Sequence, residues 1–166
     1  MSMYQSSIPV FLNMLGNLKH ILQKGAAHAE AKGIDPSVFI NSRLAPDMFP
    51  LSRQVQIAGD MVKGCGARLA GIDVPKYEDN ETTFAELIQR VEKTMTFLQS
   101  LTPAQIDGSE QKAIELVLRT RTLNFTGQDY LQFFVIPNMY FHITTAYDIL
   151  RHNGVELGKP DFIGGR

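Results

Sequence analysis

The sequence predicts an all-α fold, a four-helix bundle with long connections and a short β-hairpin near residues 111–125. Four long segments repeat apolar residues at i, i+3, i+4 and i+7, which is the spacing of one buried helix face. The connections between them, of roughly 10–25 residues, exceed the 2–8 residues typical of simple up-and-down bundles. The chain has 166 residues, which fits one domain over 1–166.

The N-terminal half contains the first two long helices. The first is expected over residues 8–32, because Ser7 can cap its start and Pro9 is tolerated in a first turn. A linker with a short helical turn over 37–40 follows. The second long helix is expected over 51–70, and its glycines indicate close approach of a neighbouring helix.

The third long helix starts at a capping box formed by Thr83 and Glu86 and ends before Pro103. Residues 111–125 then alternate apolar and polar side chains in part, which predicts a short β-hairpin. A helical turn over 113–118 is the alternative interpretation of the same segment.

The last long helix is expected from about residue 126 to residue 152. Seven of the fifteen aromatic residues of the chain lie between Phe125 and Tyr147, so this helix is expected to be the most buried. Pro137 lacks an N–H, and its ring clashes with the carbonyl of Phe133, which predicts a kink at this point.

Composition excludes several classes of function. Sixteen basic and seventeen acidic side chains give a net charge of −1, so no nucleic-acid partner is expected. No run approaches the ~18 apolar residues of a membrane span, so no membrane partner is expected either. A single cysteine excludes an internal disulfide framework and a Cys-based zinc cage. With no basic leader followed by an apolar stretch, the expected location is the cytoplasm.

Five sequence runs carry a family resemblance. They are IPNMYFHITTAY at 136–147, ILRHNGV at 149–155, GKPDF at 158–162, RLAPDM at 43–48 and QVQIAGD at 54–60. On these runs the chain resembles an uncharacterised bacterial domain-of-unknown-function family within the DinB/YfiT-like four-helix-bundle superfamily. The resemblance covers nearly the whole chain. It implies a DinB-like bundle, frequent dimers, and metalloenzyme chemistry that is thiol-dependent in some members.

The resemblance also implies a usual metal site, with one histidine on the second helix and a His-x-x-x-His pair on the last. This chain departs from that pattern. Ala146 stands four residues after His142, Asp148 stands four residues before His152, and the expected second helix has no histidine. The His triad that would bind a divalent metal such as Zn, Ni or Fe is therefore incomplete in this chain.

The candidate site residues lie on the second and last long helices. His142 is the candidate base or metal ligand, or alternatively a core histidine that is hydrogen-bonded to a neighbouring helix. Gln54 and Asp60 are expected to complete a pocket with it, unless they belong to a solvated helix face. Thr145 is grouped with them as a pocket residue. Cys65 lies in an apolar stripe, where a buried thiol is inert.

Two classes of function follow from these residues. The first is a ligand-binding or structural bundle that has lost the usual three-His metal site. The alternative is a metal-dependent or acid–base enzyme, of hydrolase or thiol transferase type, with a pocket between the second and fourth long helices. A homodimer is expected on both interpretations, because the nearly all-apolar last helix and the glycines of the second offer more apolar surface than one bundle covers. Where the chain binds a ligand, that ligand is expected to be a small molecule.

Overall fold

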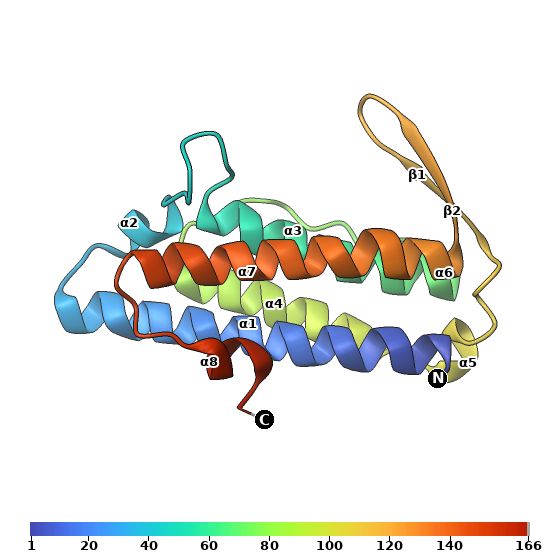
Figure 1. Ribbon diagram of the computed structural model, residues 1–166, viewed down its shortest axis with the longest axis horizontal. Helices are drawn as coiled ribbons and strands as arrows, with labels where there is room; N and C mark the ends of the chain where they lie inside the picture. The colour runs from blue at the N-terminus through green and yellow to red at the C-terminus, as the bar shows by residue number, and fades with distance from the viewer. Residues whose placement is uncertain (166) are drawn as a thin grey trace.

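Four long helices lie side by side in the computed structural model, which describes residues 1–165 (Figure 1). They are α1 (Met3–Lys32), α3 (Leu51–Ala70), α4 (Phe84–Gln99) and α7 (Ile136–His152). The apolar stripe of each helix faces the others, and the buried side chains form one hydrophobic cluster. The predicted all-α bundle is confirmed.

The shorter elements lie at the two ends of the bundle and along its side. They are α2 (Pro36–Ile40), α5 (Pro103–Ile106), β1 (Ala113–Val117), β2 (Thr122–Thr126), α6 (Gly127–Asp129), the π-helix η1 (Tyr130–Val135) and α8 (Lys159–Ile163). Strands β1 and β2 form the predicted hairpin, an antiparallel pair that projects away from the helices (Figure 1).

Helix α1 begins earlier than the sequence predicts, so the expected start at residue 8 is wrong. Ser2 is the cap, since its side chain accepts a hydrogen bond from the N–H of Gln5. The N–H of Tyr4 donates to Asp107 at 2.8 Å. With these first-turn donors satisfied, Pro9 lies inside the helix, where it removes only one backbone hydrogen bond.

Helices α3 and α4 agree with their predicted positions. Helix α3 spans Leu51–Ala70 and ends at Gly71, whose φ of 73° is in the left-handed region. The capping box of Thr83 and Glu86 starts α4. A Cβ at Gly66 would come within 2.7 Å of Leu101, so this glycine allows the close approach that the sequence predicts.

The last long helix continues through Pro137 after a change of helical register. Thr126 caps α6, and the π-helix η1 follows directly. The N–H of Ile136 donates to the carbonyl of Leu131, five residues back. This wider turn precedes the proline ring, and α7 then continues to His152.

None of the helices within residues 1–165 combines the length and the apolar character needed to span a lipid bilayer.

Gly127 is the point where the hairpin joins the last helix, and its substitution tests this joint. A Cβ at Gly127 would overlap the backbone carbonyl oxygen of Ser109, which cannot rotate away as a side chain can. Gly127→Ala is therefore expected to lower the free energy of unfolding by roughly 1–3 kcal/mol, measured by urea denaturation.

Gly59→Ala is the matched control. Its Cβ would meet only the hydroxyl of Thr94 at 3.5 Å, an ordinary contact, inside helix α3. This change is expected to be neutral or to stabilise by up to about 1 kcal/mol, because alanine favours the helix. Equal effects of the two substitutions would contradict the close contact at Gly127.

Candidate functional site

His142 and Gln54, two of the predicted site residues, form a buried hydrogen-bonded pair between α7 and α3. The Nδ1 atom of His142 lies 2.7 Å from Oε1 of Gln54. The amide nitrogen of Gln54 donates to the carbonyl of Phe49 at 3.1 Å, which turns Oε1 toward the histidine. Because Oε1 can only accept, His142 carries its proton on Nδ1.

The surroundings of His142 favour its neutral form. Burial lowers the pKa of His142, and the positive charge of Arg53 lowers it further. The ring also meets the edge of Phe141, with ring centroids 5.2 Å apart. A neutral imidazole that donates from Nδ1 keeps its lone pair on Nε2.

Thr145 and Asp60, the other predicted site residues, do not join this pair. The hydroxyl of Thr145 donates to the carbonyl of Phe141 in its own helix. Asp60 follows Gln54 by six residues, which turns it about 120° around α3, and its carboxylate binds Lys63 at 2.8 Å and Arg90 at 3.2 Å.

The donor set around His142 does not fit the three-His metal site that the family resemblance implies. Nδ1 is engaged by Gln54, so a metal could bind only at Nε2. Position 146, four residues further along α7, is a buried alanine. Across residues 1–165, His, Cys, Asp and Glu side chains form no group of three or more that could hold a metal ion.

Asp60 instead belongs to a cluster around Arg90, which we call the Arg90 cluster and which consists of Arg90, Asp60, Asp79 and Glu81. The Arg90 side chain is only 3% exposed, and its guanidinium lies 2.9 Å from Asp79 and from Glu81. Burial opposes its charge, but the hydrogen bond to Glu81 and the charges of Asp60, Glu81 and Asp79 raise the pKa of Arg90 above its ordinary value.

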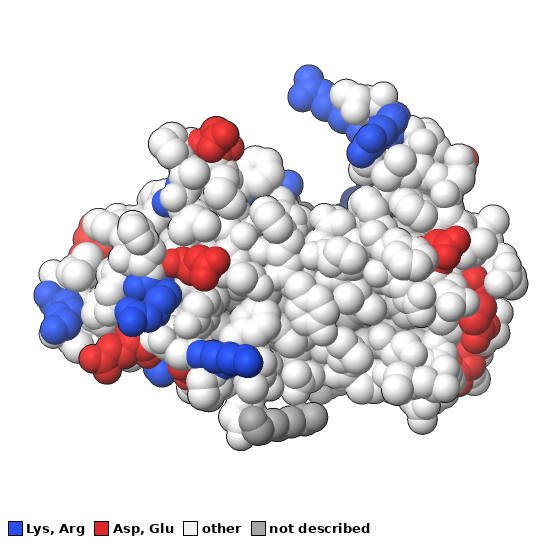
Figure 2. Space-filling view, viewed as in Figure 1, with Lys and Arg blue, Asp and Glu red and all other residues white. Residues whose placement is uncertain are grey.

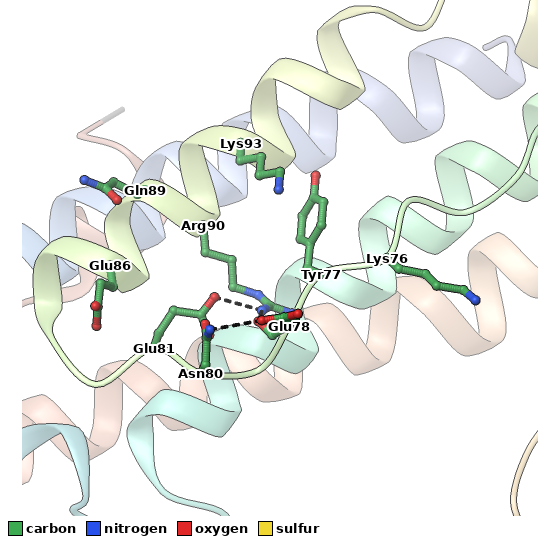
Figure 3. Close-up of a pocket in the computed structure, with 9 residues that line it drawn as sticks. All are labelled: Lys76, Tyr77, Glu78, Asn80, Glu81, Glu86, Gln89, Arg90 and Lys93. Carbon is green, nitrogen blue, oxygen red and sulfur yellow. Dashed lines mark hydrogen bonds and ion pairs between the residues drawn. The ribbon is translucent and has the colours of Figure 1, made fainter.

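The Arg90 cluster fixes the connection between α3 and α4 against both helices. Arg90 also donates to the backbone carbonyl of Glu78 at 2.9 Å. Figure 3 shows its bond to the Glu81 carboxylate. Tyr77, one residue earlier, stacks against cations, with Nζ of Lys63 3.8 Å and Nζ of Lys93 4.3 Å from its ring centroid. The Tyr77 ring is thereby held as a wall between two hollows, one of which is drawn in Figure 3.

The second hollow, of about 490 Å³, lies on the far side of Tyr77, and we call it the hairpin hollow. Helix α3, the α3–α4 connection, the β-hairpin and η1 all contribute to it. Its lining residues are Asp60, Met61, Lys63, Gly64, Arg68, Val74, Pro75, Lys76, Tyr77, Leu116, Leu118, Tyr130 and Phe134. Most of these side chains are apolar or aromatic, which is typical of small-molecule sites.

Arg68 and Tyr130 are paired at the edge of the hairpin hollow. The guanidinium of Arg68 donates to the Tyr130 hydroxyl at 3.0 Å, and its carbon lies 5.8 Å from the centre of the Tyr130 ring. Burial, followed by the neighbouring Cys65, raises the pKa of Tyr130 to about 12, so its hydroxyl stays protonated at neutral pH.

Cys65 lies below this surface and is fully buried. Burial raises the pKa of its thiol far above the ordinary value, which keeps the sulfur protonated and unreactive.

Sequence reasoning therefore missed the hairpin hollow and two of its main residues, Arg68 and Tyr130. One local signal existed, because Gly64 precedes Arg68 by four residues and lies on the same helix face. A Cβ at Gly64 would overlap the Arg68 guanidinium, so the glycine makes room for it. The approach of the hairpin and η1 to this face had no local signal.

Comparisons with known proteins agree with the fold. A family model described as "Domain of unknown function (DUF1993)" matches residues 3–163. The chain is also similar to the solved structure of a DinB family member protein from Shewanella denitrificans, with 45% identity and a TM-score of 0.88. That alignment covers 98% of this chain and 92% of the other. A search of curated proteins found no match.

The buried His142–Gln54 pair makes a prediction about stability and pH. The unfolded histidine has an ordinary pKa of about 6.5, above that of the folded residue, so the unfolded state takes up the proton first. The contribution of His142 to the free energy of unfolding is fully present above about pH 6.5. It is lost as the pH falls from there toward the lowered pKa of the folded residue. Compared with His142→Asn, whose amide does not titrate, the wild type is expected to lose unfolding free energy over this range.

Urea denaturation of both proteins between pH 8 and pH 5 measures this difference. The same substitution at the exposed His152 controls for the removal of a histidine from α7. Parallel stability curves for the wild type and His142→Asn would show that the folded and unfolded histidines have the same pKa.

Proposed function

The chain belongs to the DUF1993 family, and we propose that it is a small-molecule-binding bundle whose ligand occupies the hairpin hollow. The observation that carries this proposal is the hollow itself, a space of about 490 Å³ with mainly apolar walls and a few charged groups. Pockets of roughly 300–1,000 Å³ with this composition are typical of small-molecule sites.

The walls of the hairpin hollow are held in place from several sides, which supports a built site rather than a gap between loops. The Arg90 cluster holds the wall that contains Tyr77. Leu116 is turned inward by the alternation of β1, whereas the neighbouring Val117 is 71% exposed. The π-helix η1 supplies Tyr130, and π-helical turns frequently occur at functional sites.

The contacts of His142 support the proposal that the three-His metal site has been lost. His142 and Gln54 satisfy one another, and Phe49 satisfies the second side of the amide. Gln54 precedes Arg68 by fourteen residues, about 21 Å along α3, so the pair and the edge of the hairpin hollow are separate places. We place this binding bundle, as one domain, in the bacterial cytoplasm, where its single buried Cys65 needs no disulfide partner.

Binding in the hairpin hollow can be tested with N-phenyl-1-naphthylamine, an uncharged probe that becomes fluorescent in apolar surroundings. The wild type is expected to bind it saturably. Leu116→Trp enlarges a side chain that points into the hollow and is expected to weaken binding by about tenfold or more, equivalent to ~1.4 kcal/mol.

Val117→Trp is the matched control, because this neighbour faces outward and the added ring stays in solvent. Circular dichroism of both variants checks that the helices are retained. Absence of saturable binding, or equal weakening by the two substitutions, would rule out a ligand in the hairpin hollow.

We also propose that the chain forms a homodimer through the face shared by α1, η1 and α7. Residues 1–18 and 130–147 contain no Asp, Glu, Lys or Arg. The middle of this face is free of charged side chains in Figure 2, which shows them mainly toward the ends of the bundle. Phe133 is 73% exposed and Phe141 is 56% exposed there. Exposed aromatic residues on an uncharged patch are typical of protein interfaces.

A second copy of this chain suits the face because a twofold axis places the same surface against itself. Like charges would then meet across the axis, and an uncharged face avoids that repulsion. A shallow groove of about 270 Å³ between α1 and Tyr140 of α7 offers a place for a partner side chain.

Sedimentation equilibrium at micromolar concentration tests the homodimer. The wild type is expected to sediment at twice its chain mass of 18.6 kDa. The double substitution Phe133→Glu and Phe141→Glu is expected to give monomers, because it brings buried negative charges together at the interface. Val38→Glu, a 53% exposed position on α2, should leave the dimer intact. A monomeric wild type would refute the proposal.

A further inference from the structure

We propose that the ligand of the hairpin hollow is an organic monoanion, a carboxylate with an apolar body, and that its carboxylate binds Arg68. The inference rests on the proposed function, because it names the chemical class of the ligand for that hollow. One contrast within the hollow carries it: Arg68 lines an apolar hollow without an acidic partner, whereas the neighbouring buried cations, Lys63 and Arg90, have theirs.

The charge of Arg68 is not compensated by the protein. No Asp or Glu side chain in the described part of the chain comes within 4.0 Å of its guanidinium. Its hydrogen-bond partner, the Tyr130 hydroxyl, is neutral. By contrast, Arg90 contacts three carboxylates and Lys63 contacts Asp60. A partly buried cation without a counter-charge attracts an anion.

The guanidinium of Arg68 is also held in a fixed position. Gly64 leaves the space into which it folds back across the surface of α3. The Tyr130 hydroxyl accepts one of its N–H groups at 3.0 Å. The remaining N–H groups keep the planar fork that matches the two oxygens of a carboxylate.

The other residues that line the hairpin hollow indicate the charge of the ligand and the character of the rest of the ligand molecule. Asp60 is engaged by Lys63 and Arg90, so it does not neutralise Arg68. Lys76 is exposed at the edge, where water solvates its ammonium group. One uncompensated, partly buried charge favours a monoanion, and the walls formed by Leu116, Phe134 and their apolar neighbours favour an apolar body.

A pair of competitors of nearly the same shape, one anionic and one neutral, tests the inference. 2-Naphthoate and its uncharged amide, 2-naphthamide, each displace N-phenyl-1-naphthylamine from the wild type in a fluorescence titration. We expect 2-naphthoate to displace half of the probe at a concentration about tenfold lower than 2-naphthamide does. The ratio of these two concentrations is expected to fall as salt is added. In Arg68→Met we expect the ratio to fall to about one, with the uncharged probe still bound.

Arg151→Met is the matched control, since it removes an exposed arginine at the distant end of α7 and should keep the wild-type ratio. Equal displacement by the two competitors in the wild type, or an unchanged ratio in Arg68→Met, would overturn the inference while leaving a ligand-binding hollow. If Arg68→Met does not fold, the wild-type ratio and its salt dependence still decide. If neither the probe nor 2-naphthoate binds, the proposed function fails together with the inference.

Discussion

The ion pairs of the buried Arg90 guanidinium are the interactions on which the hairpin-hollow side of this bundle depends. An arginine removed from water is stable when its charge is paired and most of its N–H groups have acceptors. Asp60 of α3, together with Asp79, Glu81 and the Glu78 carbonyl of the connection, pairs the charge and accepts from the two terminal nitrogens, while the buried Nε has no acceptor among the described residues. The connection is consequently fastened to two helices at once, although it has no regular secondary structure of its own. This arrangement fixes the position of Tyr77, which forms one wall of the hairpin hollow.

The opposite wall depends on how the chain enters its last helix. Gly127 lets the start of α6 press against the Ser109 carbonyl, which sets where the hairpin leaves the bundle. The π-helical turn before Pro137 then allows one nearly continuous helix to contain both Tyr130 and His142. Tyr130 lies near the start of this helix and His142 lies in the middle of α7, so the two residues have different neighbours. Tyr130 meets an arginine at the edge of an apolar hollow, and His142 meets an amide in the core.

The His142–Gln54 pair shows how a bundle can keep a buried polar contact without the three-His metal site that the family resemblance implies. An imidazole that donates from Nδ1 to an amide oxygen, beside Arg53, is stable in its neutral form. The amide is itself anchored to Phe49, so the contact joins the connection before α3 to the middle of α7. Such a fully satisfied polar pair specifies how two helices pack, in addition to any contribution to stability.

Local patterns in the sequence determined the helices, because apolar periodicity, the capping box at Thr83 and the glycine after Ala70 act within a few residues of one another. They also determined that the His triad is incomplete, since that follows from residue identity alone. The start of α1 did have a local signal, the capping box of Ser2 and Gln5, to which the fold adds Asp107 as acceptor for the N–H of Tyr4. Only the tertiary structure decided which polar residues meet. Six residues along α3 turn Asp60 away from Gln54 and toward Arg90, and the hairpin hollow is formed by four segments whose approach no local pattern encodes.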